Sequence, residues 1–347
     1  MIKFAALLLI SGLSLSAQDV HVRVQPGAAS AAPGNEAQTT FPTIQNALDH
    51  HPFAGPGGRV FIEIVPGTYN ERIIVTQNHR NITLLGTGAK PEDVVITNSL
   101  NAKTSGGTFF TETAEINGDG FEADNLTFEN TAGNTGQAVA AAVRADRVVF
   151  KHVRFLGHQD TLFADYGRQY YLDSYIEGGV DFIFGNATAV FAHSEIHANG
   201  PGYLTAQSRT DPNQPTGYVI TNSRVTTSLE ASAPPPAGAP GAASTAAARN
   251  QTALGRPWRP FARVVFMNTE LPAQLNPAGY TVWKRGDPEP PQAWYAEYNN
   301  SGPGWQPTQR PTWDHLLTAK EAAAFEPQNF LRGHDNWNPI TTAAKLP

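Results

Sequence analysis

Short runs of β-branched and aromatic residues recur along the chain, and their spacing restricts the fold more than any other feature. Each run has a polar turn residue followed by alternating apolar residues; the runs are residues 81–84, 125–128, 152–155, 174–176, 193–196 and 222–225. When these runs are aligned, Phe128, Phe155, Ile176 and Ile196 fall at equivalent positions of successive runs. An irregular period in the twenties predicts a solenoid whose coils each add short strands to parallel sheets.

The expected architecture is therefore an all-β, right-handed parallel β-helix. The alternative is a β-sandwich, in which strands follow one another at roughly 8 to 12 residues. The inward alternation of apolar residues fits both folds. Helical periodicity is confined to two short candidates, residues 41–50 and 319–325.

Most of the chain, residues 18–347, is expected to form a single domain. Residues 228–250 interrupt the β pattern with a proline triplet, several glycines and many alanines, which predicts a mobile loop. An interdomain linker is the alternative, but β-type sequence resumes at residues 263–266.

Residues 1–17 have the pattern of a secretory signal peptide: one lysine, an apolar run over residues 4–10, and small residues ending at Ala17. The apolar run is too short to span a bilayer, which needs roughly 20 residues. The sequence therefore predicts a secreted protein, extracellular or periplasmic; a retained N-terminal anchor is the alternative.

The composition excludes several kinds of function. The chain has no cysteine, so thiol catalysis and cysteine metal sites are ruled out. Its formal charge is −6 and no Lys/Arg run occurs, so neither nucleic acid nor an anionic membrane is an expected partner. A monomer is expected.

Two amides and two carboxylates are spaced so that a solenoid would bring them together. Gln137, Gln159 and Asp181 are equally spaced in the sequence, and Asp160 follows Gln159. Residues one coil apart lie roughly 4.8 Å from each other in such a fold. The four side chains should therefore converge on one ridge.

This grouping suits ester cleavage. One carboxylate can attack the ester carbonyl, a second carboxyl can protonate the leaving alcohol, and amide N–H groups can stabilise the oxyanion. From the residues alone, a structural polar ladder or a cation site fits equally well.

Five segments, in order along the chain, resemble the signature regions of the pectin methylesterase (pectinesterase) family. They are residues 67–71 (GTYNE), 137–140 (QAVA), 159–162 (QDTL), 181–185 (DFIFG) and 254–258 (LGRPW). Residues 205–207, 211–214, 295–298 and 302–304 are similar to further family segments. The resemblance implies a right-handed parallel β-helix and hydrolysis of the C6 methyl esters of methylated homogalacturonan, without metal or organic cofactor.

The resemblance also implies roles for individual residues. Asp181 matches the nucleophile and Asp160 the general acid and base. Gln137 and Gln159 match the oxyanion hole, and Arg256 matches the residue that orients the nucleophile. Trp258 and Trp283 are expected to stack on sugar rings, and Phe182 is a candidate substrate contact.

Three positions depart from the family pattern. Ala141 and Ala142 stand where Leu-Arg is common, and His158 stands where an aromatic residue often precedes QDTL. These changes put subsite preference in doubt more than activity.

Other functions fit the same scaffold. A pectate lyase needs a calcium site and a base, and a polygalacturonase needs carboxylates that flank the glycosidic bond, but neither accounts for the Gln and Arg residues. A related esterase on another substrate and a noncatalytic carbohydrate-binding protein are the remaining alternatives. The acidic balance of the chain predicts a preference for highly methylated pectin.

Overall fold

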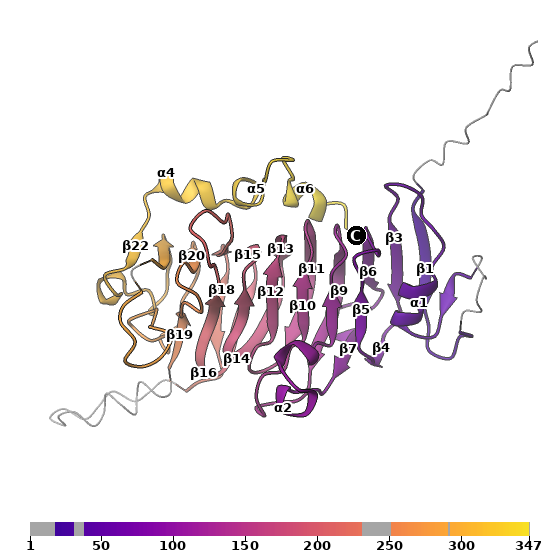
Figure 1. The fold of residues 1–347 in the computed structure, drawn as a ribbon, viewed down its shortest axis with the longest axis horizontal. Helices are drawn as coiled ribbons and strands as arrows, with labels where there is room; N and C mark the ends of the chain where they lie inside the picture. Colours follow the sequence, from indigo (N-terminus) through magenta and orange to yellow (C-terminus); the bar gives the residue numbers. More distant parts are fainter. Residues whose placement is uncertain (1–17, 31–37, 231–250, 291, 347) are drawn as a thin grey trace, which may run out of the picture.

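Strands one coil apart pair in parallel throughout the described residues, which are 18–30, 38–230, 251–290 and 292–346 of this computed structural model. The strands stack along one axis, with successive coils side by side (Figure 1). Their pairings fall into three series, described below as three sheets, which strands that bend from one to the next join into a continuous network. The chain is thus a right-handed parallel β-helix, as its periodicity predicted.

The first sheet holds one strand from each coil: β1 (Val20–Val24), β3 (Val60–Ile64), β6 (Ile82–Gly86), the start of β9 (Glu122–Asn130), the start of β11 (Val148–Leu156), β13 (Arg168–Leu172), β15 (Thr188–Ala192), β17 (Gly217–Thr221), β20 (Arg263–Met267), β21 (Trp294–Tyr298) and β22 (Asp314–Leu316). A short strand, β2 (Thr40–Phe41), pairs with β1.

The second sheet holds β4 (Gly67–Asn70), β7 (Val94–Asn98), the ends of β9 and β11, the start of β14 (Tyr175–Gly185), the start of β16 (Glu195–Gln207) and β18 (Arg224–Thr227). The third sheet holds β5 (Ile73–Val75), β8 (Ala114–Ile116), β10 (Ala141–Arg144), β12 (Leu162–Tyr166), the ends of β14 and β16, and β19 (Thr252–Gly255).

The interior is filled by columns of side chains from successive coils. Phe128, Phe155, Ile176 and Ile196 pair in register, which confirms the alignment made from the sequence. The Phe128 and Phe155 rings stack with centroids 5.8 Å apart. Because each coil buries its apolar residues only against its neighbours, this stacking is the main source of stability.

The corner between the first and second sheets is made by residues in the left-handed region. Asn125, His152, Asp173, His193 and Asn222 all have φ between 48° and 56°. Asn, Asp and His adopt this conformation more readily than other side chains, which explains why a polar residue begins or directly precedes each of these runs.

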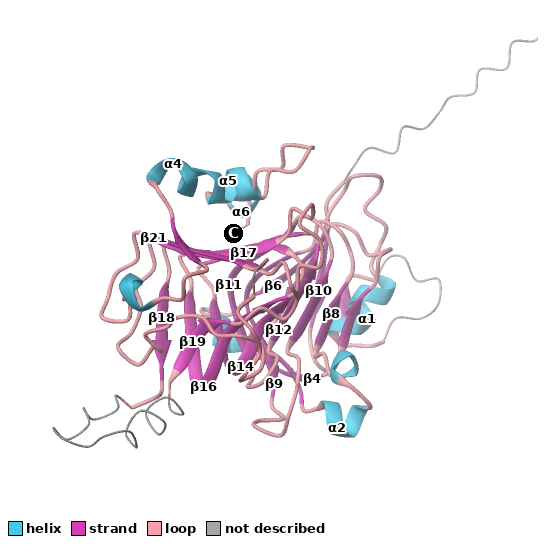
Figure 2. Ribbon diagram, turned by 60° about the vertical axis from the view of Figure 1, so that its left-hand side comes forward, coloured by secondary structure: helices cyan, strands magenta, loops and turns pink. Residues whose placement is uncertain are grey.

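The helices are short and lie on the outside (Figure 2). They are α1 (Ile44–His50), α2 (Ala102–Ser105), α4 (Ala319–Ala322), α5 (Pro327–Phe330) and α6 (Pro339–Ala343), with the 3-10 turns η1 (Pro91–Asp93), η2 (Thr108–Phe110), η3 (Pro307–Gln309) and η4 (Ala323–Phe325). Both helical segments predicted from the sequence are present, the first in shorter form as α1 and the second as α4 with η4.

The C-terminal helices cover the outer face of the first sheet. Val149, Val190 and Val219 point outward from that sheet and are fully buried against a cluster that includes Ala343 and Leu331. The outer face of the sheet is apolar here because its side chains form a second hydrophobic core with the C-terminal helices.

Two predictions fall largely on undescribed residues. The proposed signal peptide, residues 1–17, lies outside the described residues, and so do residues 231–250 of the predicted loop. None of the helices in the described ranges has the length and apolar character needed to cross a bilayer.

Candidate active site

The corner between the second and third sheets carries the two aspartates predicted to be catalytic. β14 bends at Asp181, with φ of 50°, and Asp160 has φ of 63° just before β12. Asp tolerates this left-handed backbone, so the chain turns the corner there without a glycine and the two carboxyl groups belong to neighbouring coils.

The register of the strand pairing makes the two aspartates neighbours on adjacent coils. Gln137 bridges to Gln159, but Gln159 bridges to Val180, the residue before Asp181. The Asp160 amide donates to the Val180 carbonyl at 3.1 Å. Asp181 is therefore the neighbour of Asp160, whereas equal coil lengths would have aligned it with Gln159.

A cleft of about 350 Å³ opens at this corner. Seven of the eight residues predicted from the sequence line it: Gln137, Gln159, Asp160, Asp181, Arg256, Trp258 and Trp283. The coil spacing predicted this convergence for the two Gln and two Asp residues, and the family resemblance supplied Arg256 and the two tryptophans.

Arg256 holds Asp181 with two hydrogen bonds. Its Nε donates to Oδ1 at 2.9 Å and its Nη2 donates to Oδ2 at 2.6 Å. Nη1 donates to the Trp283 carbonyl at 2.8 Å, and the guanidinium carbon lies 4.0 Å from the Tyr203 ring centroid and 4.2 Å from that of Trp283. These contacts with Asp181, Trp283 and Tyr203 hold the planar guanidinium in one position, so it fixes the orientation of the Asp181 carboxylate.

The two carboxyl groups differ in their surroundings. Both are buried, with 9% of Asp160 and 6% of Asp181 exposed. Burial, with the neighbouring negative charge of Asp181, raises the pKa of Asp160 to about 8, and Arg256 opposes this only in part. Burial also raises the pKa of Asp181, but its hydrogen bonds and ion pair with Arg256 act against that rise. Asp160 is therefore the carboxyl group that keeps its proton at neutral pH, and Asp181 the one that ionises first.

The amides of Gln137 and Gln159 face the same cleft. Within the described part of the chain, neither carboxamide has a hydrogen-bond partner, so their N–H groups are free to donate to an oxygen in the cleft. Two such donors beside a carboxylate and a protonated carboxyl are the parts needed to stabilise an oxyanion.

Aromatic rings form one wall of the cleft. Trp258 and Trp283 stack with centroids 6.4 Å apart, and Trp258 lies 6.0 Å from Phe184. Broad aromatic faces suit the C–H faces of sugar rings.

The structure corrects one predicted site residue. Phe182 is fully buried in the core and does not line the cleft. Phe184, two residues along β14, faces the cleft instead. The alternation of the strand is broken at this corner, because the consecutive residues Phe182 and Ile183 both lie in the core and the register shifts between Val180 and Ile183.

Besides Phe184, two further aromatic residues at the site were not predicted from the sequence. Phe109 in η2 is 45% exposed at the cleft and lies 4.9 Å from the Phe163 ring. Tyr203 supports Arg256 from β16. A pair of phenylalanines shortly after Gly106 and Gly107 was a signal for an exposed aromatic loop, but nothing in the sequence marked Tyr203.

The candidate catalytic groups of the cleft are carboxyl, amide and guanidinium side chains. Among the residues that the structure describes, no group of three or more His, Asp or Glu side chains is arranged to hold a metal ion. The arrangement supplies a candidate nucleophile, a proton donor and oxyanion donors from the side chains themselves.

Comparison with protein families gives one match that covers most of the chain. Residues 31–334 match the model of the family described as Pectinesterase. Among curated proteins, Pectinesterase 1 of Citrus sinensis is 38% identical over 319 residues, which is 89% of this chain. The same match covers 51% of that relative, so the chain spans about half of its length.

Solved structures agree with the sequence comparison. The pectin methylesterase from carrot has a TM-score of 0.79 and 34% identity, over 93% of this chain and 96% of the carrot chain. A pectin methylesterase solved in complex with a hexasaccharide has a TM-score of 0.67 and 28% identity, over 92% of this chain and 98% of that one.

Proposed function

The chain belongs to the pectinesterase family, and from that membership we propose that it hydrolyses the C6 methyl esters of pectin to methanol and pectate. The observation that carries the proposal is the pairing in one cleft of Asp181, held by Arg256, with the protonated neighbour Asp160.

In the first half of the proposed reaction, the Asp181 carboxylate attacks the C6 carbonyl carbon of a methylated galacturonate residue. The carbonyl oxygen becomes negatively charged and accepts hydrogen bonds from Gln137 and Gln159. The bond to the methoxy group then breaks, and Asp160 gives its proton to the departing methanol. The product is an anhydride between Asp181 and the sugar acid.

In the second half, water attacks the C6 carbonyl and Asp160, now ionised, takes the proton. The anhydride breaks to release the acid, and Asp181 leaves as a carboxylate. Arg256 stabilises this leaving carboxylate with the same two hydrogen bonds that orient the nucleophile. Both aspartates return to their starting state.

Trp258 and Trp283 are proposed to hold the sugar rings. Both line the cleft, and both are partly exposed. In the proposal, this aromatic wall beside the two carboxyl groups positions the ester.

Export is proposed together with this activity. The N-terminal pattern of residues 1–17 and an extracellular polysaccharide substrate point to the same compartment.

A release assay tests the proposal. We expect the purified chain to release methanol from highly methylated pectin, with an equal gain of titratable carboxylate, and to do so in the presence of a chelator. Acetylated pectin without methyl esters serves as the matched substrate. Release of acetate but not methanol would assign the site to another ester, and release of neither would indicate a binding protein.

A further inference from the structure

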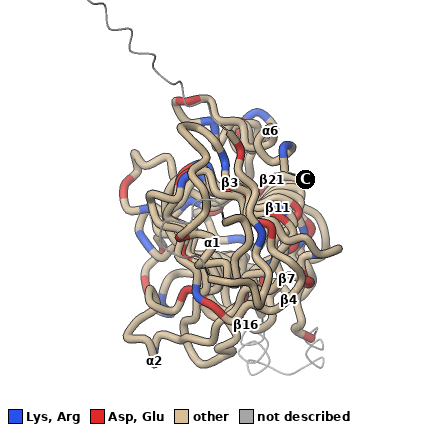
Figure 3. The backbone as a smooth tube through the Cα atoms, turned by 90° about the vertical axis from the view of Figure 1, so that its right-hand side faces the viewer, with Lys and Arg blue, Asp and Glu red and all other residues tan. Residues whose placement is uncertain are grey.

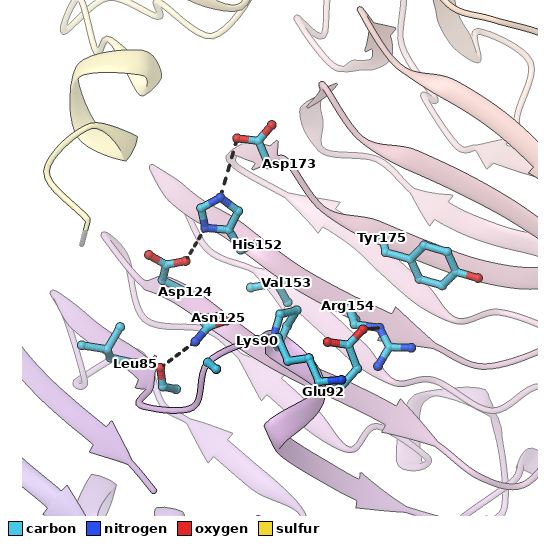
Figure 4. Close-up of a pocket in the computed structure, with 13 residues that line it drawn as sticks. Leu85, Lys90, Glu92, Asp124, Asn125, His152, Val153, Arg154, Asp173 and Tyr175 are labelled. Atoms are coloured by element: carbon cyan, nitrogen blue, oxygen red, sulfur yellow. Dashed lines mark hydrogen bonds and ion pairs between the residues drawn. The ribbon is translucent and has the colours of Figure 1, made fainter. Parts of the chain in front are cut away.

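A second cavity lies at the opposite edge of the second sheet, away from the aspartate pair. Its volume is about 810 Å³, compared with about 350 Å³ for the catalytic cleft. Tyr175 lies in its wall and begins β14, the strand that bends at Asp181 (Figure 4). The stretch of strand between these two residues spans about 20 Å, so the two sites are separate.

The wall of this cavity is rigid. The loop between β6 and β7 is held by Asn125, whose Nδ2 donates to the carbonyls of Gly86 at 3.0 Å and Gly88 at 2.8 Å. Asp93 accepts from the Ala89 and Lys90 amides at 2.8 and 3.2 Å. A site with such a fixed wall loses little entropy when a ligand binds.

One end of the cavity combines a cation with an aromatic ring. Arg154 and Tyr175 are paired across β11 and β14, and the guanidinium carbon lies 5.6 Å from the Tyr175 ring centroid. The Tyr175 hydroxyl donates to Glu177 at 2.8 Å, which fixes the ring. The His197 ring also stacks on Tyr175, with centroids 5.9 Å apart. Tyr175 therefore lies between two side chains and holds the guanidinium in place, and a planar guanidinium suits the carboxylate of a sugar acid.

The Arg154 guanidinium is only loosely engaged. Its Nε lies 3.6 Å from Glu92, an ion pair in which the Glu92 side chain is 44% exposed. Within the described ranges its two Nη nitrogens have no hydrogen-bond partner. Lys90 is exposed on the same wall. Arg154 can therefore present its fork to an incoming carboxylate.

The other acidic residues of the cavity gather at its far end. Asp124 is buried beside Lys151, at 3.8 Å, and His152, at 3.1 Å. Asp173 lies 3.9 Å from His152 (Figure 4). These carboxylates face a cation or an imidazole of their own, so they leave the Arg154 end free to take an anion.

We propose that this cavity is a second, noncatalytic saccharide site, which binds a demethylated galacturonate residue with its carboxylate on Arg154. The choice of ligand rests on the proposed function, because galacturonate is its product. A chain that has been demethylated in the cleft would remain attached through this second site.

Calorimetric titration of the full chain with trigalacturonate tests the proposal. We expect two classes of binding site. Arg154→Gln should weaken one class by at least about tenfold, because a paired charge-assisted contact is lost. Glu92→Gln should tighten the same class, because it removes the carboxylate that competes for the guanidinium. Arg80→Gln, which removes an exposed arginine paired with Asp119, is the matched control and should change neither class.

Trp258→Ala separates the two sites, since it should weaken only the class that belongs to the cleft. The proposal is overturned if Arg154→Gln binds as the wild type does, or if Trp258→Ala removes all binding. Methanol release by Arg154→Gln from a short methylated oligosaccharide should equal that of the wild type. Absence of the proposed esterase activity from the wild type and every variant, with binding that depends on Arg154 retained, would refute the function and leave this site standing.

Discussion

The protonation of one residue, Asp160, sets the expected pH dependence of the reaction. Its pKa is raised to about 8, so it is available as a proton donor below that pH and ionises above it. In the proposed reaction Asp181 attacks as a carboxylate, so activity should also fall in acid. We expect kcat to follow a bell-shaped profile whose alkaline limb lies near pH 8, measured as methanol release across pH in buffers of constant ionic strength. An alkaline limb that persists unchanged in Asp160→Asn would show that another group controls it.

The same raised pKa makes Asp160 a destabilising residue at neutral pH. Because its folded pKa exceeds the unfolded value of 3.8, its contribution to stability is fully present below pH 3.8 and is lost as pH rises through about 8. Asp160→Asn should therefore raise the free energy of unfolding above pH 8 by roughly 2–5 kcal/mol, with little change near pH 4. Denaturant melts of both proteins at the two pH values measure this difference. A variant no more stable than the wild type at either pH would mean that Asp160 is not buried as described.

Individual site residues could be predicted from the sequence where their side chains have a distinctive chemistry. The two Gln and two Asp residues were marked by their coil spacing and Arg256 by the family resemblance, and all five line the cleft. Phe182 and Phe184 are chemically identical, and only the irregular register at the corner of β14 decides which of them faces inward.

At the scale of elements, substitutions in β14 test whether Phe182 lies in the core and Phe184 in the cleft. Phe182→Leu should lower the free energy of unfolding by about 1 kcal/mol and leave the KM for pectin unchanged, because the side chain packs only in the core. Phe184→Leu, the matched change two residues on, should raise KM because its ring lines the cleft beside Trp258. Denaturant melts and initial rates on both variants give the comparison, and a raised KM in Phe182→Leu alone would contradict the placement.

The coils themselves were predictable because the aromatic columns repeat with the backbone. The exact register of the coils was not predictable. Gln137 pairs with Gln159, but Gln159 pairs with Val180, so the second coil is one residue shorter than the first. A one-residue difference of this kind comes from the length of a corner, and no local pattern in the sequence reports it.

At the scale of the whole molecule, the last two helices, α5 and α6, were the largest omission. The outward valines of the first sheet read as ordinary strand residues, and only the structure shows that α5 and α6 bury them. The sequence period describes what faces inward and says nothing about what covers the outside.

The charge of the whole chain predicts a substrate preference. Acidic and basic residues are interspersed along the chain (Figure 3), and the net charge is −6. We expect faster methanol release from highly methylated than from sparsely methylated pectin, because the latter is a polyanion. Added salt should narrow the difference by screening the repulsion. Rates on pectins of graded methylation at two salt concentrations check this; a preference for low methylation would contradict it.

The central claim is that Asp181 acts as the nucleophile, and methanol release by Asp181→Asn tests it most directly. Asp173→Asn is the matched control, since Asp173 is also an aspartate in the left-handed region, with φ of 48° compared with 50° for Asp181, and it lies at another corner of the β-helix. The account predicts that Asp181→Asn folds but loses methanol release by a factor of at least about a thousand, whereas Asp173→Asn retains it. Near-normal release by a folded Asp181→Asn would contradict the account.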